Sequence, residues 1–236
     1  MTPAEKFRDL LFCPLDLPEP PVVDYNRFCE WRDEQAEFNK KHNFTAALAN
    51  GKDSYPWEVA WALWWNTYDK PNPWICDFEN YFPELVEYIR MYPFVKPKSI
   101  SFLDQKESRD VYLHTDPDYR WGMRFYLFNG LGEKLYFAKS KTRNETRLTT
   151  MKDGVYQDLW EHSQKEKIYA EFPNHRSAWM LNSFNAFHGV EKNPNPSGNR
   201  VTCVLIGDYD YAALFELMER SSKKYKEYAI WWTEPH

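Results

Sequence analysis

The spacing of apolar residues changes near residue 95 and divides the chain into a helical and a β-rich portion. Before this point apolar residues recur at intervals of three and four, which is typical of one face of a helix. Thr2-Pro3-Ala4-Glu5 predicts a short first helix, and Asp24 or Asn26 can cap a second helix that ends near Lys41. The pattern therefore predicts a mainly helical portion over residues 1–95.

Two more helices are expected in this portion, near residues 56–65 and 79–91. The first would contain Trp57, Trp61 and Trp64, whose separations of four and three place them on one helical face. We interpret these tryptophans as packing residues rather than as a platform for substrate.

From Ser99 onward, short runs rich in β-branched and aromatic residues are separated by turn sequences. We expect strands at 100–103, 111–114, 124–128, 135–138, 179–181, 187–190 and 200–207, with a hairpin turn at 129–132. Strands of this length and spacing favour a sandwich or barrel, and a double-stranded β-helix, or jelly roll, can enclose a small metal site. The expected fold is α+β and mainly β, with a cupin-like core over 99–207, N-terminal helices, and a C-terminal helix in 208–236 that runs from about Tyr211 to Trp231.

Composition indicates one domain without a membrane span. No glycine-serine or charge-rich linker divides the 236 residues, so we expect a single domain over 1–236. The apolar runs are too short to cross a bilayer, and the first ten residues are too charged for a secretory signal. The four cysteines form no CxxC pair, which favours reduced thiols and a cytoplasmic protein.

The net charge of −5 bears on the class of partner. Broad affinity for duplex nucleic acid needs a basic face that displaces counterions, and no basic stripe is evident. We therefore expect a small-molecule substrate, with neither duplex nucleic acid nor a membrane as partner. The sequence does not indicate an oligomeric state.

The sharpest chemical pattern is a set of three side chains, His114, Asp116 and His188. Two imidazoles and one carboxylate are the ligands that hold Fe(II) on one face and leave positions open on the other. Residues i and i+2 of an extended segment point to the same side, so His114 and Asp116 can aim at one point. His188 must then come from a different strand.

A turn sequence at 193–199 follows His188 and precedes Arg200. If it closes a hairpin, His188 and Arg200 fall opposite each other on paired strands, with Cβ atoms about 5 Å apart. Thr202 would share the side of Arg200 and donate a second hydrogen bond to a carboxylate held there. A bulge in the long turn would break this register.

Together, His114-Thr115-Asp116, His188 and Arg200-Val201-Thr202 resemble the HxD…H…RxS/T signature of the Fe(II)/2-oxoglutarate-dependent dioxygenases. The resemblance covers about residues 99–207. Arg124, on the strand after the first ligand, is similar to an arginine of the aspartyl/asparaginyl β-hydroxylase-like branch, and Tyr126 would share its side of that strand.

The resemblance implies a cofactor set and a reaction. Fe(II), 2-oxoglutarate as cosubstrate and O2 would be required, with Arg200 and Thr202 on the distal carboxylate. Arg124 can bind the other end of the cosubstrate, a substrate carboxylate or an acidic neighbour, and Tyr126 can donate to the cosubstrate or pack. The carboxylate at position 116 resembles the hydroxylases rather than the halogenating members of the superfamily. Desaturation and related outcomes use the same ligands and stay open.

Other residues are weaker candidates. Trp121 can roof the pocket or pack in the scaffold, and Asn182 and Asn185 can bond substrate or satisfy the turn before His188. His175 lies in a proline-asparagine setting typical of a surface loop, so we prefer His188 as the second histidine ligand.

Three functions remain in view. The first is a hydroxylase of a small, polar, carboxylate-bearing molecule such as an amino acid or a derivative. The second is a peptidyl hydroxylase of the aspartyl/asparaginyl type, which would need an open groove rather than a closed pocket. The third is a non-catalytic cupin-like binding protein that keeps the pocket without turnover.

Overall fold

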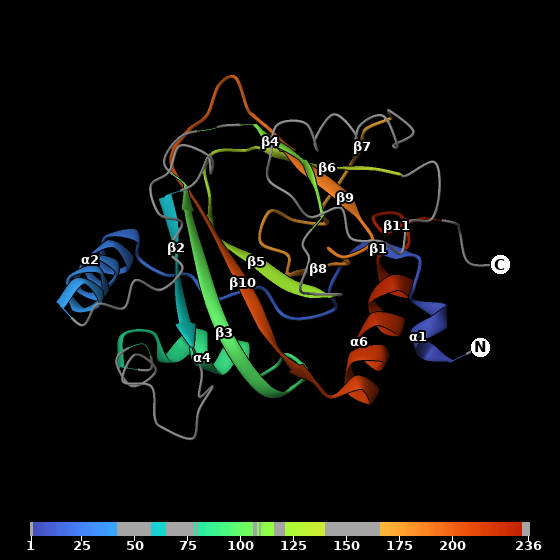
Figure 1. The fold of residues 1–236 in the computed structure, drawn as a ribbon, viewed down its shortest axis with the longest axis horizontal. Helices are drawn as coiled ribbons and strands as arrows, with labels where there is room; N and C mark the ends of the chain where they lie inside the picture. The colour runs from blue at the N-terminus through green and yellow to red at the C-terminus, as the bar shows by residue number, and fades with distance from the viewer. Residues whose placement is uncertain are drawn as a thin grey trace.

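Two antiparallel sheets form the centre of the fold (Figure 1). The computed structural model describes residues 2–41, 58–64, 78, 80–105, 108, 110–115, 121–139 and 166–232. Within them, a seven-stranded sheet has the order β11-β1-β8-β5-β10-β3-β2 and a four-stranded sheet has the order β4-β9-β6-β7. The strands are β1 (Leu10–Pro14), β2 (Glu58–Trp64), β3 (Phe94–Gln105), β4 (Val111–His114), β5 (Gly122–Asn129), β6 (Lys134–Ala138), β7 (Ile168–Tyr169), β8 (Trp179–Leu181), β9 (Phe187–Glu191), β10 (Arg200–Tyr209) and β11 (Ile230–Trp231).

The two sheets pack face to face. Phe12 on β1 and Phe137 on β6 place their ring centroids 5.7 Å apart, across the space between the sheets. Both belong to one buried cluster, here called the inner cluster, to which each sheet contributes; its other buried members are Leu11, Tyr126, Leu135, Trp179, Leu181, Ala186 and Ile230. The faces that meet there are called the inner faces.

Helices cover the outer face of the seven-stranded sheet. They are α1 (Pro3–Lys6), α2 (Tyr25–Lys41), α4 (Pro83–Ile89) and α6 (Tyr211–Lys224). Trp31 of α2 is fully buried and stacks edge-on against Phe82, which precedes α4, and against Phe102 of β3. Apolar faces of helices and sheet thereby form a second buried cluster, the outer cluster.

Sequence signals located three helices close to where the structure has them. Thr2 caps α1, and the Asp24 side chain accepts the Arg27 N–H at the start of α2, as the cap residues predict. The helix expected at 79–91 is present as α4, with a proline in its first turn.

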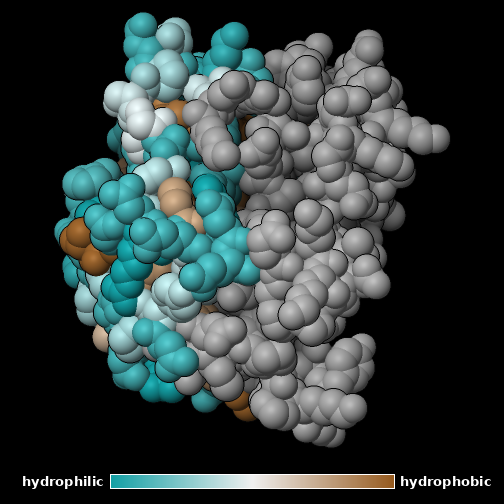
Figure 2. Space-filling model, turned by 90° about the vertical axis from the view of Figure 1, so that its left-hand side faces the viewer, coloured by the Kyte–Doolittle hydropathy of each residue, from teal (hydrophilic) through white to brown (hydrophobic). Residues whose placement is uncertain are grey.

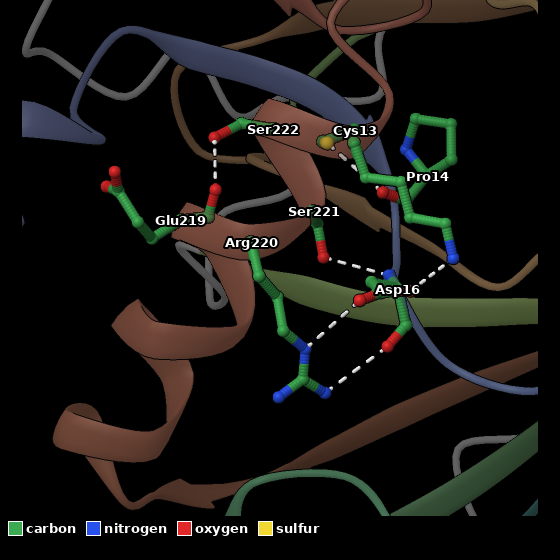
Figure 3. Close-up of polar contacts among 8 residues, drawn as sticks. Cys13, Pro14, Asp16, Glu219, Arg220, Ser221 and Ser222 are labelled. Carbon is green, nitrogen blue, oxygen red and sulfur yellow. Dashed lines mark hydrogen bonds and ion pairs between the residues drawn. The ribbon is translucent and has the colours of Figure 1, made fainter.

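The C-terminal portion differs from the helix expected from about Tyr211 to Trp231. Asp210 caps α6, but the helix ends at Lys224, and Ile230–Trp231 form a strand that pairs with β1. An edge of β1 is available there, and its backbone groups need partners. Asp16 then holds α6 against the end of β1, since its N–H donates to Ser221 Oγ at 2.9 Å and its carboxylate lies 3.5 Å from Arg220 (Figure 3).

The helix expected at 56–65 is wrong. Residues Glu58–Trp64 are strand β2, which pairs with β3 from Trp64↔Ser99 to Glu58↔Asp104. Valine and tryptophan are strand formers, and the segment pairs with the long β3 at Glu58 and at residues 61–64, with an irregularity between them. Pairing with β3 thus determined the secondary structure of a segment whose apolar spacing is also compatible with a helix.

The hairpin expected at 129–132 is also wrong, although the strands around it are confirmed. β5 pairs with β8 and β10, whereas β6 pairs with β7 and β9, so the 130–133 connection passes from one sheet to the other. The strands expected at 111–114 and 179–181 have the same bounds as β4 and β8, and β3, β9 and β10 are longer than expected.

The described surface is largely polar where it can be viewed. Figure 2 shows mostly hydrophilic residues on the described part of the face beside α2, with isolated hydrophobic ones. Among the described residues, no helix combines the length and the apolar character that crossing a membrane would require.

Candidate functional site

Two histidines meet on the four-stranded sheet. His114 at the end of β4 and His188 near the start of β9 are partners in the antiparallel register, and their ring centroids lie 4.3 Å apart. Phe187 belongs to a small cluster on the outside of this sheet, so its neighbour His188 points to the inner face. The His188 ring accordingly lies 6.5 Å from that of Phe137 in the inner cluster.

The predicted pairing of His188 with Arg200 is wrong. β9 pairs with β4 and β6, while β10 pairs with β3 and β5 in the other sheet, so the 193–199 turn carries the chain between sheets. His188 therefore faces a second histidine along its sheet, and Arg200 belongs to the opposite wall.

A backbone carbonyl fixes the orientation of the His188 ring. Nδ1 lies 3.0 Å from the carbonyl oxygen of Ala186. A carbonyl can only accept, so Nδ1 carries the hydrogen in this contact and the neutral ring keeps its lone pair on Nε2. Protein metal sites orient their histidine ligands through this kind of hydrogen bond.

The third predicted ligand, Asp116, lies outside the described residues. Within the described ranges no group of three or more His, Cys, Asp or Glu side chains is arranged to hold a metal ion. The structure thus brings together two of the three predicted ligands, His114 and His188.

Four predicted cosubstrate residues share the inner face of the opposite sheet. On β10, Val201 and Cys203 belong to the outer cluster, so the alternating residues Arg200 and Thr202 point inward. The same alternation on β5 turns Arg124 and Tyr126 inward, and Tyr126 is itself a member of the inner cluster. Thr202 and Tyr126 are register partners across β10 and β5.

Arg200 is held by two buried side chains that sequence analysis missed. Its Nη1 forms an ion pair with Glu133, whose side chain is fully buried, and its Nη2 donates to Gln105. Gln105 in turn donates from Nε2 to Glu133 Oε1 at 2.6 Å, which closes a cycle of three polar contacts. Gln105 is the register partner of Arg200 on β3, but no sequence signal placed Glu133 there.

The charges of this cycle also reach Tyr126. Burial raises the pKa of the Tyr126 phenol; the guanidinium charges of Arg200 and Arg124 oppose the rise, and the Glu133 carboxylate adds to it. The phenol therefore stays protonated at neutral pH and keeps a hydrogen to donate.

Arg124 lies at the other end of the same face. A Cβ added to Gly122 would stand 3.0 Å from Arg124 Nη1, so the guanidinium folds back over the glycine that starts β5. Residues 122 and 124 are on one side of the strand, and the missing side chain leaves room for the arginine.

The three weaker candidates have packing and turn contacts. The Trp121 ring meets that of Phe215 on α6 at 5.6 Å, within the outer cluster. The side-chain amides of Asn182 and Asn185 both donate to the Arg8 carbonyl, at 3.2 and 3.4 Å. These contacts match the structural alternatives, and a substrate role for the three residues stays a prediction.

Comparisons with known proteins gave the following. No family model matches the sequence, and no curated protein matches it significantly. Among solved structures, the fold is similar to that of the non-heme alpha ketoglutarate dependent carbocyclase SnoK from nogalamycin biosynthesis, at 11% identity and a TM-score of 0.44, covering 87% of this chain and 82% of that one. HygX from Streptomyces hygroscopicus, with nickel and 2-oxoglutarate bound, matches at 11% identity and a TM-score of 0.37 over 88% and 87% of the chains. A prolyl hydroxylase from Trichoplax adhaerens, in complex with a peptide fragment, matches at 10% identity and a TM-score of 0.39 over 89% and 88%.

Proposed function

We propose that this protein is an Fe(II)/2-oxoglutarate-dependent dioxygenase that hydroxylates a C–H bond of a small, polar, carboxylate-bearing molecule. The observation that carries the proposal is the pairing of His114 with His188 on the inner face of one sheet, with Arg200 and Arg124 on the inner face of the other. We further propose that the two sheets form a double-stranded β-helix within a single oxygenase domain.

The residues present fit a ferrous ion. His114 and His188 would supply two imidazoles from adjacent strands, and Asp116 would supply the carboxylate of the expected ligand set. The bond from His188 Nδ1 to the Ala186 carbonyl directs the metal-binding lone pair to Nε2. When bound, iron with 2-oxoglutarate and O2 supplies the oxidation that the protein side chains themselves cannot perform.

The remaining side chains would bind and orient. Arg200 and Thr202 would hold the distal carboxylate of 2-oxoglutarate through charge-assisted hydrogen bonds, and the protonated Tyr126 phenol would donate a further one. Arg124 would bind a carboxylate of the substrate or of the cosubstrate. Phe137 and Trp179, both buried in the inner cluster, would exclude water from this space.

One observation favours a second candidate, a non-catalytic binding protein. Glu133 already neutralises Arg200, and a protein that bound 2-oxoglutarate weakly or not at all would tolerate this arrangement. No described feature favours a peptide over a small molecule as substrate.

Turnover separates these candidates. The protein is loaded with Fe(II) without oxygen, exposed to air with 2-oxoglutarate and a panel of amino acids and their derivatives, and assayed for succinate and hydroxylated product in equal amounts. His188→Ala serves as the inactive variant, and exposed His175→Ala is its matched control. If the protein binds both iron and 2-oxoglutarate but consumes no 2-oxoglutarate, whether or not a candidate substrate is present, the result would favour the binding protein.

A further inference from the structure

Arg200, which is predicted to bind the cosubstrate, already forms an ion pair with a carboxylate of the same chain, that of Glu133. The Arg200 and Glu133 side chains are 8% and 0% exposed, and Gln105 bonds to both. Arg200 Nε is buried and has no hydrogen-bond partner among the described residues. The Nε–H therefore stays unused, while each terminal nitrogen makes one of the two contacts.

The loop that carries Glu133 is held in place from several directions. Leu131 is buried, and its carbonyl accepts from Asn193 Nδ2 at 2.9 Å. The Gly130 N–H donates to the Asn199 carbonyl at 2.7 Å, and the Gly130 carbonyl accepts from the Ser197 N–H at 3.1 Å. These bonds join the 130–133 connection to the 193–199 turn immediately before Arg200. The backbone is therefore held in place at both partners of the ion pair, Glu133 and Arg200.

We infer that Glu133 is an internal competitor for the carboxylate site of Arg200 and thereby sets the affinity for the cosubstrate. The inference rests on the proposed function and names a specificity residue within it. A distal carboxylate can take the place of Glu133 at Arg200 Nη1 only if Glu133 releases that nitrogen or shares it. Glu133 is then left buried beside a second anion, which disfavours binding.

The competition also selects the ligand. A 2-oxo acid with a distal carboxylate replaces one anion on Arg200 with another, whereas a 2-oxo acid without one has nothing to offer the guanidinium. Removing the Glu133 charge should therefore improve the binding of 2-oxoglutarate and leave that of 2-oxobutyrate unchanged.

The test measures binding without turnover. Wild type and Glu133→Gln are loaded with Mn(II), which replaces the ferrous ion without oxidative chemistry, and titrated with 2-oxoglutarate and 2-oxobutyrate in a calorimeter. We expect Glu133→Gln to bind 2-oxoglutarate at least about tenfold more tightly, the factor that one hydrogen bond to a charged group supplies. Glu87→Gln removes an exposed carboxylate on α4 with the same change of charge and is the matched control.

A second variant guards against loss of folding. Glu133→Asp keeps the charge and withdraws the carboxylate by one methylene, so we expect a smaller gain in 2-oxoglutarate affinity. Folded Glu133→Gln or Glu133→Asp that binds 2-oxoglutarate no more tightly than wild type would overturn the inference while leaving the proposed function intact. A gain of equal size for 2-oxobutyrate would also overturn it. Absence of 2-oxoglutarate binding in every variant, despite bound Mn(II), would overturn the proposed function itself.

Discussion

His114 and His188 are register partners on adjacent antiparallel strands, and their rings lie 4.3 Å apart between centroids. Each comes from a different part of the chain, and the pairing of β4 with β9 brings them together. Their mutual position is therefore set by backbone hydrogen bonds of a sheet, which hold a site more firmly than loops do.

His188→Ala should remove metal binding without unfolding the protein. One imidazole of the proposed ligand set is lost. Loss of a residue that only supports a metal ligand lowers affinity by up to about 100-fold, so we expect loss of a ligand to lower the affinity for Fe(II) or Mn(II) by more than that. Metal content after equilibrium dialysis is the measurement. His175→Ala, which changes an exposed loop histidine, is the control, and equal metal loss in both variants would contradict the assignment.

Gly189→Ala should weaken metal binding although it removes no ligand. A Cβ at residue 189 would lie 2.6 Å from the Val111 carbonyl oxygen and 2.6 Å from the Tyr136 hydroxyl, so β4 or the tyrosine must move. Overpacking of this kind costs about 1–3 kcal/mol of stability and would shift β4, which carries His114, away from β9. Urea unfolding and metal titration measure the two effects, and unchanged metal affinity would show that the strand pairing does not position the histidines.

Trp31→Ala should destabilise the scaffold. The fully buried Trp31 ring meets the Phe28, Phe82 and Phe102 rings at 5.9, 5.6 and 5.4 Å, and its removal leaves a cavity between α2 and the sheet. We expect a loss of about 3–5 kcal/mol in the free energy of unfolding. Tyr211→Ala, at an exposed position on α6, should change it by less than about 0.5 kcal/mol. Similar losses in the two variants would argue against this packing.

Glu219 should make a small contribution to stability that disappears in acid. Hydrogen bonds from Lys223 and then Lys6 lower the pKa of the Glu219 carboxyl below its ordinary 4.5 in the folded protein. The contribution is therefore fully present above pH 4.5 and is lost as the pH falls through the lower, folded-state pKa.

The comparison is between wild type and Glu219→Gln by urea unfolding at pH 7 and near pH 3. The difference in unfolding free energy should be below about 1 kcal/mol at pH 7, because the group is partly exposed, and should shrink toward zero in acid. Exposed Glu216→Gln on the same helix is the control. A difference that grew on acidification would reverse the sign of the linkage.

Local sequence signals predicted where helices and strands lie better than they predicted which strands pair with each other. Caps placed α1 and α2, and runs of β-branched and aromatic residues placed β4 and β8 within their observed bounds. Period-two alternation states which side of a strand a residue occupies, but it does not state which sheet the strand joins. The two expected hairpins failed for this reason, since the turns at 129–132 and 193–199 both connect one sheet to the other.

The same limit of local patterns explains which residues of the candidate site were predicted and which were missed. Residue chemistry predicted that His114 and His188 come together, which the structure confirms, while their role as metal ligands stays a prediction. Alternation correctly put Arg200 with Thr202 and Arg124 with Tyr126 on common faces. It did not identify Glu133, because a carboxylate in a glycine-containing turn is ordinarily exposed. Its burial follows from the packing of two connections, Gly130 against Ser197, which no local pattern encodes.

The pairing of Leu10 on β1 with Trp231 on β11 has a consequence for synthesis. β1 also pairs with β8, so both of its neighbours emerge from the ribosome long after it does. Closing such distant contacts slows folding, and an early strand with unsatisfied edges is prone to associate with other chains in the meantime. Strand β1 therefore stays without both of its sheet neighbours until residues 179–181 and 230–231 have been made.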